Sequence, residues 1–178
     1  GPDAFYLGED ERNLDCSRPE MSTRTRAGAV ALAEKRSLFT KADTAWDNGD
    51  FESAFALFTQ AAELGDRSSQ LDLGYFFDNG FWVKTNKRKA LEWYHRAYRQ
   101  GDAGGANNIA TVYRELGDSR KMLWWFRRAA AMGDTEVLLD LGKRYECGRA
   151  VPRNLAKAKA YYLRVLASRI SLEETRSE

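Results

Sequence analysis

Few side chains in this 178-residue chain have the types and spacing that catalysis requires. His95 is the only histidine, so a histidine-based metal cluster is excluded, and a serine or cysteine nucleophile has no other imidazole to activate it. A redox role for Cys147 needs a partner thiol, which only Cys16 supplies. No glycine-rich phosphate loop follows a strand, because no strand is predicted. These patterns predict a protein that is not an enzyme and that carries no cofactor and no metal.

Basic side chains gather in one predicted loop and recur on later hairpins. They are Lys84, Lys87, Arg88 and Lys89 in the loop, followed by Arg127, Arg128, Arg149, Arg153, Lys157 and Lys159. Acidic residues are interspersed, however, and 28 basic against 26 acidic residues leave a net charge of only +2. Nucleic-acid binders carry a stronger basic footprint, so these charges indicate a solvated surface and no nucleic-acid partner.

The composition fits one all-helical domain with a sizeable core. Hydrophobic residues make up 43% of the chain, and there are only three prolines. Uninterrupted apolar runs fall far short of the roughly 20 residues that span a bilayer, so no membrane partner is expected. The chain shows no secretory signal pattern, and its two cysteines favour a reducing, cytoplasmic location.

Three markers recur along the chain in one phase. A glycine closes successive units at Gly65, Gly101 and Gly133, with steps of 36 and 32 residues. A small residue inside the first helix of a unit repeats with the same steps at Gly74, Ala110 and Gly142. A small or apolar residue opens each second-helix core face at Ala54, Ala90, Met122 and Ala158. Repeats of this length are single supersecondary units, so the pattern predicts a solenoid of helical hairpins.

The apolar periodicity predicts two amphipathic helices in each unit. The expected ranges are 26–48, 51–64, 67–78, 87–99, 103–115, 119–131, 135–146 and 154–168. In the longer loops, Val83 and Val151 should tuck under their hairpins, with Trp82 beside Val83. Aromatic residues at matching second-helix positions are interpreted as core: Trp93, Tyr94, Trp124, Trp125, Phe126, Tyr161 and Tyr162.

Two stretches carry a family resemblance. LGxxFxxG at Leu73–Gly80 and LGxxYxxG at Leu141–Gly148 resemble Sel1-like repeats of the tetratricopeptide superfamily. Units Lys41–Asp66 and Ile109–Asp134 have a loop four residues shorter and resemble plain tetratricopeptide repeats. The resemblance covers residues 27–168. It implies an all-α, right-handed α-solenoid of about four helix-turn-helix repeats with a capping helix.

In such hairpin solenoids the first helices line a concave groove, and positions beside the packing leucine and small residue point into it. The candidate binding residues are Asp43, Trp46, Leu71, Asp72, Tyr75, Asn79, Asn107, Asn108, Thr111, Arg114, Leu139, Asp140, Lys143 and Glu146. This mixture suits an extended peptide, because asparagine amides bond to a backbone while tyrosine and leucine offer apolar contact. A merely solvated groove is the alternative, since any polar helix face looks similar in sequence.

The resemblance implies a scaffold or adaptor that binds a protein or short peptide. An inhibitor or immunity protein that occludes a toxin or enzyme is the second reading, because small bacterial members of the family often have that role. Very tight one-to-one binding would favour the inhibitor, and weak binding of several peptides would favour the adaptor.

Residues 1–20 form an acidic leader that precedes the repeat domain at 21–168 and a polar tail at 169–178. The leader holds six acidic and two basic residues, a net charge of −4, so the remainder carries +6. Met21 is a plausible natural start, and Gly1-Pro2 resembles the remnant of a cleaved tag. The leader is a candidate tethered ligand in cis or in trans, and an ordinary disordered leader is the alternative. Its candidate contact residues are Phe5, Tyr6, Leu7, Glu9 and Asp10.

Overall fold

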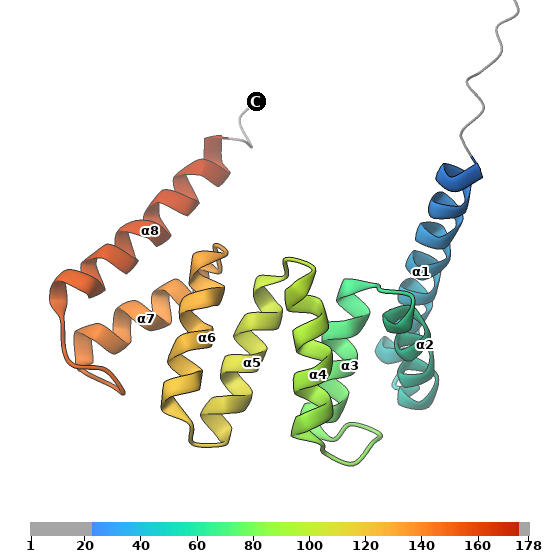
Figure 1. Ribbon diagram of the computed structural model, residues 1–178, viewed down its shortest axis with the longest axis horizontal. Coiled ribbons are helices and arrows are strands. Elements are labelled where there is room, and N and C mark those ends of the chain that lie inside the picture. Colours follow the sequence, from blue (N-terminus) through green and yellow to red (C-terminus); the bar gives the residue numbers. More distant parts are fainter. Residues whose placement is uncertain (1–22, 175–178) are drawn as a thin grey trace, which may run out of the picture.

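The computed structural model describes residues 23–174, which form a single curved row of helices (Figure 1). Within this range there are eight helices and no strand: α1 Thr23–Asp47, α2 Phe51–Glu63, α3 Arg67–Asn79, α4 Lys87–Arg99, α5 Ala103–Glu115, α6 Ser119–Ala131, α7 Thr135–Cys147 and α8 Leu155–Glu174. Each helix packs mainly against its neighbours in sequence. The predicted all-α repeat solenoid is confirmed. α8 continues to Glu174, within the segment 169–178 that we expected as a tail.

Short polar side chains define where the helices begin. The residue before each helix from α2 to α8 accepts a hydrogen bond from the backbone N–H three positions later, at 2.8–3.1 Å; these caps are Asp50, Asp66, Asn86, Asp102, Asp118, Asp134 and Asn154. The glycine that precedes the cap between successive hairpins takes a left-handed conformation, as at Gly101 with φ 84°. A glycine adopts this conformation without steric cost, and the chain can therefore turn sharply into the next unit.

The loops inside the hairpins come in two lengths. Residues 48–50 and 116–118 form short loops, and residues 80–86 and 148–154 form long ones. In the long loops Val151 is buried and Val83 is half-buried, as predicted. Trp82 does not tuck under the hairpin, because its side chain is 59% exposed. Its φ of 56° turns the chain so that Val83 faces the core and Trp82 faces solvent.

The contact between the two helices of a hairpin pairs a small residue with a large ring. A Cβ atom on Gly74 would lie 2.5 Å from Cε1 of Tyr94, and one on Gly142 would clash in the same way with Tyr162. Because neither glycine has a side chain, the tyrosine ring lies directly against the backbone of the first helix. The recurring small residue is therefore a packing requirement of the hairpin.

The aromatic residues of the second helices divide between core and surface. Tyr94, Trp125 and Phe126 are buried, and Trp93 is half-buried. Trp124 is 47% exposed, so its assignment to the core is wrong. Successive helical residues point about 100° apart, so the run from 124 to 126 cannot face the core throughout.

We predict that Gly74→Leu or Gly142→Leu lowers the free energy of unfolding by about 1 to 3 kcal/mol or more, because the new side chain overpacks the tyrosine contact. Chemical denaturation followed by circular dichroism measures the change. Gly28→Ala in α1 is the control, since nothing lies within 4 Å of its added Cβ. Unchanged stability in both leucine variants would show that the hairpin contact is misassigned.

Candidate functional site

The candidate residues of α1 and α3 surround a cavity of about 310 Å³, which we call the first hollow. Asp43 and Trp46 come from α1, and Asp72 and Tyr75 come from α3. Phe58 of α2 also lines the cavity. Four of the side chains predicted to point into a groove therefore lie together around one hollow.

Candidate residues of α5 and α7 line a second cavity of about 280 Å³, the second hollow. Its lining comprises Asn107, Thr111, Arg114, Phe126, Glu136, Val137 and Asp140. Asp140 accepts a hydrogen bond from Nε of Arg144 at 2.5 Å. This hollow therefore contains an acidic side chain whose charge is already paired within the chain.

The two hollows occupy equivalent places in the repeat. Asp72 and Asp140 each stand two residues before the small residue of their first helix, at Gly74 and Gly142. Phe58 and Phe126 occupy the same second-helix position. Repeat equivalence places both hollows on one side of the row, formed by α1, α3, α5 and α7, which we call the first-helix face.

The remaining candidate residues lie outside both hollows. Leu71 is half-buried against the core, Asn108 is half-buried, and Leu139 and Lys143 are exposed. Asn79 uses its amide to donate to the backbone carbonyl of Tyr75 at 3.2 Å. Glu146 accepts a hydrogen bond from the hydroxyl of Tyr162 at 2.6 Å, so it links α7 to α8 rather than standing free. The leader residues Phe5–Asp10 lie outside the described residues, so their role as a ligand stays a prediction.

Aromatic rings that sequence reasoning did not assign to the site hold the walls of the first hollow. Trp46 makes edge contacts with Phe51 and Phe81 at ring distances of 5.1 and 5.5 Å, and Tyr75 stacks on Phe81 at 5.6 Å. Phe81 comes from the long loop after α3. In the sequence, only the adjacent aromatic residues Phe81 and Trp82 hint at a contribution from this loop. Which of the two rings faces the hollow depends on the loop conformation, which the sequence pattern does not give.

Asp72 is the most perturbed carboxyl group of the first hollow. Burial, followed by the charges of Asp43 and Asp66, raises the pKa of Asp72 from 3.8 to about 7. The lining of the hollow contains no basic side chain that would oppose this effect. Burial and the neighbouring carboxylates therefore favour the protonated form of Asp72 up to near neutral pH.

We predict a pH effect on stability from this group. Between about pH 4 and pH 7 the folded chain holds a proton on Asp72 that the unfolded chain has lost, so the free energy of unfolding falls as pH rises. Asp72→Asn has no such ionisation, so its free energy of unfolding does not fall in this way. The difference in free energy of unfolding, variant minus wild type, should therefore increase by about 1 to 3 kcal/mol from pH 4 to pH 8. Urea denaturation at several pH values measures it, with Glu63→Gln, an exposed carboxylate of α2, as control. Parallel curves for wild type and Asp72→Asn would contradict the account.

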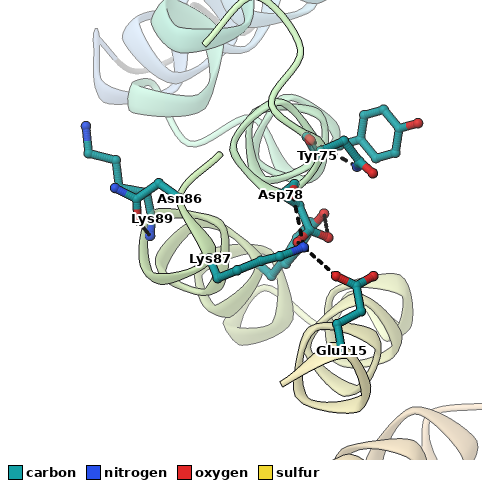
Figure 2. Close-up of polar contacts among 8 residues, drawn as sticks. Tyr75, Asp78, Asn86, Lys87, Lys89 and Glu115 are labelled. Atoms are coloured by element: carbon teal, nitrogen blue, oxygen red, sulfur yellow. Dashed lines mark hydrogen bonds and ion pairs between the residues drawn. The ribbon is translucent and has the colours of Figure 1, made fainter. Parts of the chain in front are cut away.

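A network of charged groups holds α3, α4 and α5 together (Figure 2). Nζ of Lys87 donates to Oδ1 of the buried Asp78 at 2.7 Å and also pairs with Glu115. The hydroxyl of Tyr94 donates to Oδ2 of Asp78 at 3.4 Å. Lys87, which we grouped with the basic surface residues, is thus a structural residue, because a buried carboxylate needs a positive partner.

His95 and Cys147, for which the sequence predicts no catalytic role, do not line either hollow. His95 is half-buried with its ring 5.0 Å from Trp125, and burial followed by the charge of Arg99 lowers its pKa. Cys147 is exposed as a free thiol.

Among the described residues, no group of three or more histidine, cysteine, aspartate or glutamate side chains could hold a metal ion. No described helix is long and apolar enough to cross a bilayer.

The fold and its repeat-equivalent hollows define a helical repeat protein of the α-solenoid class. The Sel1 repeat family model matches residues 67–102, 118–134 and 135–164, and a tetratricopeptide repeat model matches residues 35–64. The chain therefore belongs to the Sel1-like repeat proteins of the tetratricopeptide type. The third unit, which we expected to be a plain tetratricopeptide repeat, matches the Sel1 model over 118–134.

Similar proteins include two curated relatives and a solved structure. Chitin synthase regulatory factor 1 of Schizosaccharomyces pombe is 31% identical over 154 residues, which is 83% of this chain and 32% of the relative. The ERAD-associated E3 ubiquitin-protein ligase component HRD3 of Candida glabrata is 27% identical over 126 residues, 66% of this chain and 15% of the relative. The chain thus spans a third or less of either relative.

The crystal structure of a Sel1 repeat protein from Oxalobacter formigenes superposes with a TM-score of 0.67 at 24% identity. The similarity covers 82% of this chain and 62% of that one. At this identity the likeness supports the repeat solenoid and carries no information about a ligand.

Proposed function

We propose that this chain is a non-catalytic interaction module, a scaffold or adaptor, that holds an extended segment of a partner protein on its first-helix face. The observation that carries the proposal is the pair of equivalent hollows, one between α1 and α3 and the other between α5 and α7. Beside the buried core residues Phe58, Phe126 and Val137, both are lined by half-buried or exposed polar and aromatic side chains.

The chemistry of this face suits an extended chain. Asn107 lines the second hollow, and its amide both donates and accepts hydrogen bonds, as a peptide backbone requires. Tyr75, which is 43% exposed, and the exposed Leu139 offer apolar contact. A segment that crosses the first helices would therefore meet both backbone-binding and side-chain-binding groups, as in other modes of peptide recognition.

The comparisons favour the same reading. The names of the two relatives describe a regulatory factor and a component of a ligase. Segments similar to this chain in a regulatory factor and in a ligase component support the adaptor proposal.

We predict that replacing Tyr75, Asn108 and Lys143 together by alanine weakens binding at least tenfold, about 1.4 kcal/mol, while helicity stays near wild type. The probes are peptides selected on the wild-type chain from a displayed random library, and titration calorimetry gives their affinity. A variant with Arg88→Ala and Glu92→Ala, an exposed pair on α4, is the control and should bind as wild type does. Equal affinity of the triple variant, or its unfolding, would contradict the assignment of this face.

A further inference from the structure

We propose that the first hollow receives the positively charged side chain of a lysine or arginine from the bound segment. The inference rests on the proposed function and names the chemistry of one subsite within it. Two carboxylates approach the cavity from facing helices, Asp43 on α1 and Asp72 on α3. The rings of Trp46 and Tyr75 complete its sides. A cationic head with an apolar stem is complementary to this combination.

The negative charge in the first hollow has no partner among the side chains that line it. None of the ion pairs in the described part of the chain includes Asp43 or Asp72. The raised pKa of Asp72 follows from this environment, because burial and neighbouring carboxylates both disfavour its ionised form. An entering cation would supply the missing counter-charge and ionise Asp72.

The second hollow provides a comparison within the same chain. At the position equivalent to Trp46 it has Arg114, and its Asp140 is paired with Arg144 at 2.5 Å. The second hollow is thus lined by the basic Arg114 as well as by the acidic Glu136 and Asp140, and Arg144 neutralises the charge of Asp140. Both hollows occupy the same place in the repeat, so the fold alone does not make a hollow suitable for a cation. The unpaired carboxylates of the first hollow make the difference.

Neighbouring rings pack against the aromatic walls of the first hollow. Trp46 contacts Phe51, Phe76 and Phe81 edge-on at ring distances of 5.1 to 5.5 Å. Elsewhere in the chain, Arg96 covers Trp93 at 4.2 Å and Arg128 covers Trp124 at 4.4 Å. None of the cation–π contacts within the described residues involves Trp46 or Tyr75. The rings of Trp46 and Tyr75 therefore remain available for a cation–π contact with an organic cation from a partner.

A metal ion fits this hollow less well than a basic side chain. Calcium takes six to eight oxygen ligands, and only two carboxylates line the cavity. The described residues contain no metal-binding group of three or more acidic, histidine or cysteine side chains. Aromatic walls also contribute nothing to the coordination of a hard cation.

The proposal carries a pH dependence. The charged groups that act on Asp72 are Asp43 of α1 and Asp66, the residue that caps α3. With a pKa of about 7 in the free chain, Asp72 is mostly protonated at pH 6 and mostly ionised at pH 8. Affinity for a basic side chain should therefore rise with pH over this range, by up to about tenfold.

The test uses the full chain labelled with ¹⁵N and three blocked pentapeptides that have arginine, lysine or citrulline between glycines. Citrulline has nearly the shape of arginine without its charge. The arginine or lysine peptide should shift the indole signal of Trp46 and the amide signals of Asp43 and Asp72. The citrulline peptide should bind at least tenfold more weakly. Asp43→Asn and Asp72→Asn should each weaken the basic peptides at least tenfold, and Glu63→Gln on α2 should bind as wild type does.

Three outcomes would overturn the inference: equal binding of the citrulline peptide, no shift near Trp46 with either basic peptide, or a response to Ca²⁺ alone. If library-selected peptides still depend on Tyr75, Asn108 and Lys143 while the basic pentapeptides give no response, this inference fails and the proposed function stands. If no selected peptide depends on that face, the proposed function itself fails.

Discussion

The contact between a small residue on the first helix and a ring on the second is the constraint on which the rest of the structure depends. At Gly74 and Gly142 the space that a Cβ would need is occupied by a tyrosine ring. Ala42 and Ala110 share clusters with Phe58 and Phe126, which stand at the matching second-helix positions. Close packing at this point fixes the distance and rotation of the two helices in each hairpin.

Because this contact orients each first helix, it also decides which of its side chains remain available. The residue after the small position and the residue two before it lie outside the hairpin contact, as Tyr75 and Asp72 do. These positions vary between repeats while the fold stays constant. The fourth residue after the small position varies as well. It is Trp46 in the first hollow and Arg114 in the second, whereas in the unit between them it is the buried Asp78, which accepts a hydrogen bond from Tyr94 of its own hairpin.

Helix positions could be predicted from the sequence because they depend on local chemistry. Asp50 and Asn86 are caps that act on a backbone N–H only three residues away, and the phase of Gly74 follows from its own repeat. The surroundings of Asp72 could not be predicted in this way. They depend on Asp43 and Phe58, which lie on other helices. Sequence periodicity predicts on which side of its own helix a residue lies, but it does not predict the distance to a residue of another helix.

The same limit explains the misplaced side chains. Lys87 looked like one of several loop cations, but its position at the start of α4 brings it to Asp78 and Glu115 on two other helices. Trp124 shares a run of aromatics with buried neighbours, yet it points to solvent and lies under Arg128. In both cases the surroundings of the side chain are set by a residue on another turn or another helix. The residue types alone do not predict how far away that residue lies.

The central claim is that partner segments bind across the first helices. The most direct measurement places a nitroxide spin label on a library-selected peptide and records the broadening of amide signals in the ¹⁵N-labelled chain. The account predicts that broadening is strongest around Asp43, Asp72, Thr111 and Asp140 and weak along the exposed side of α4 and α6. Broadening centred on Glu92 and Trp124, with the first helices unaffected, would contradict it.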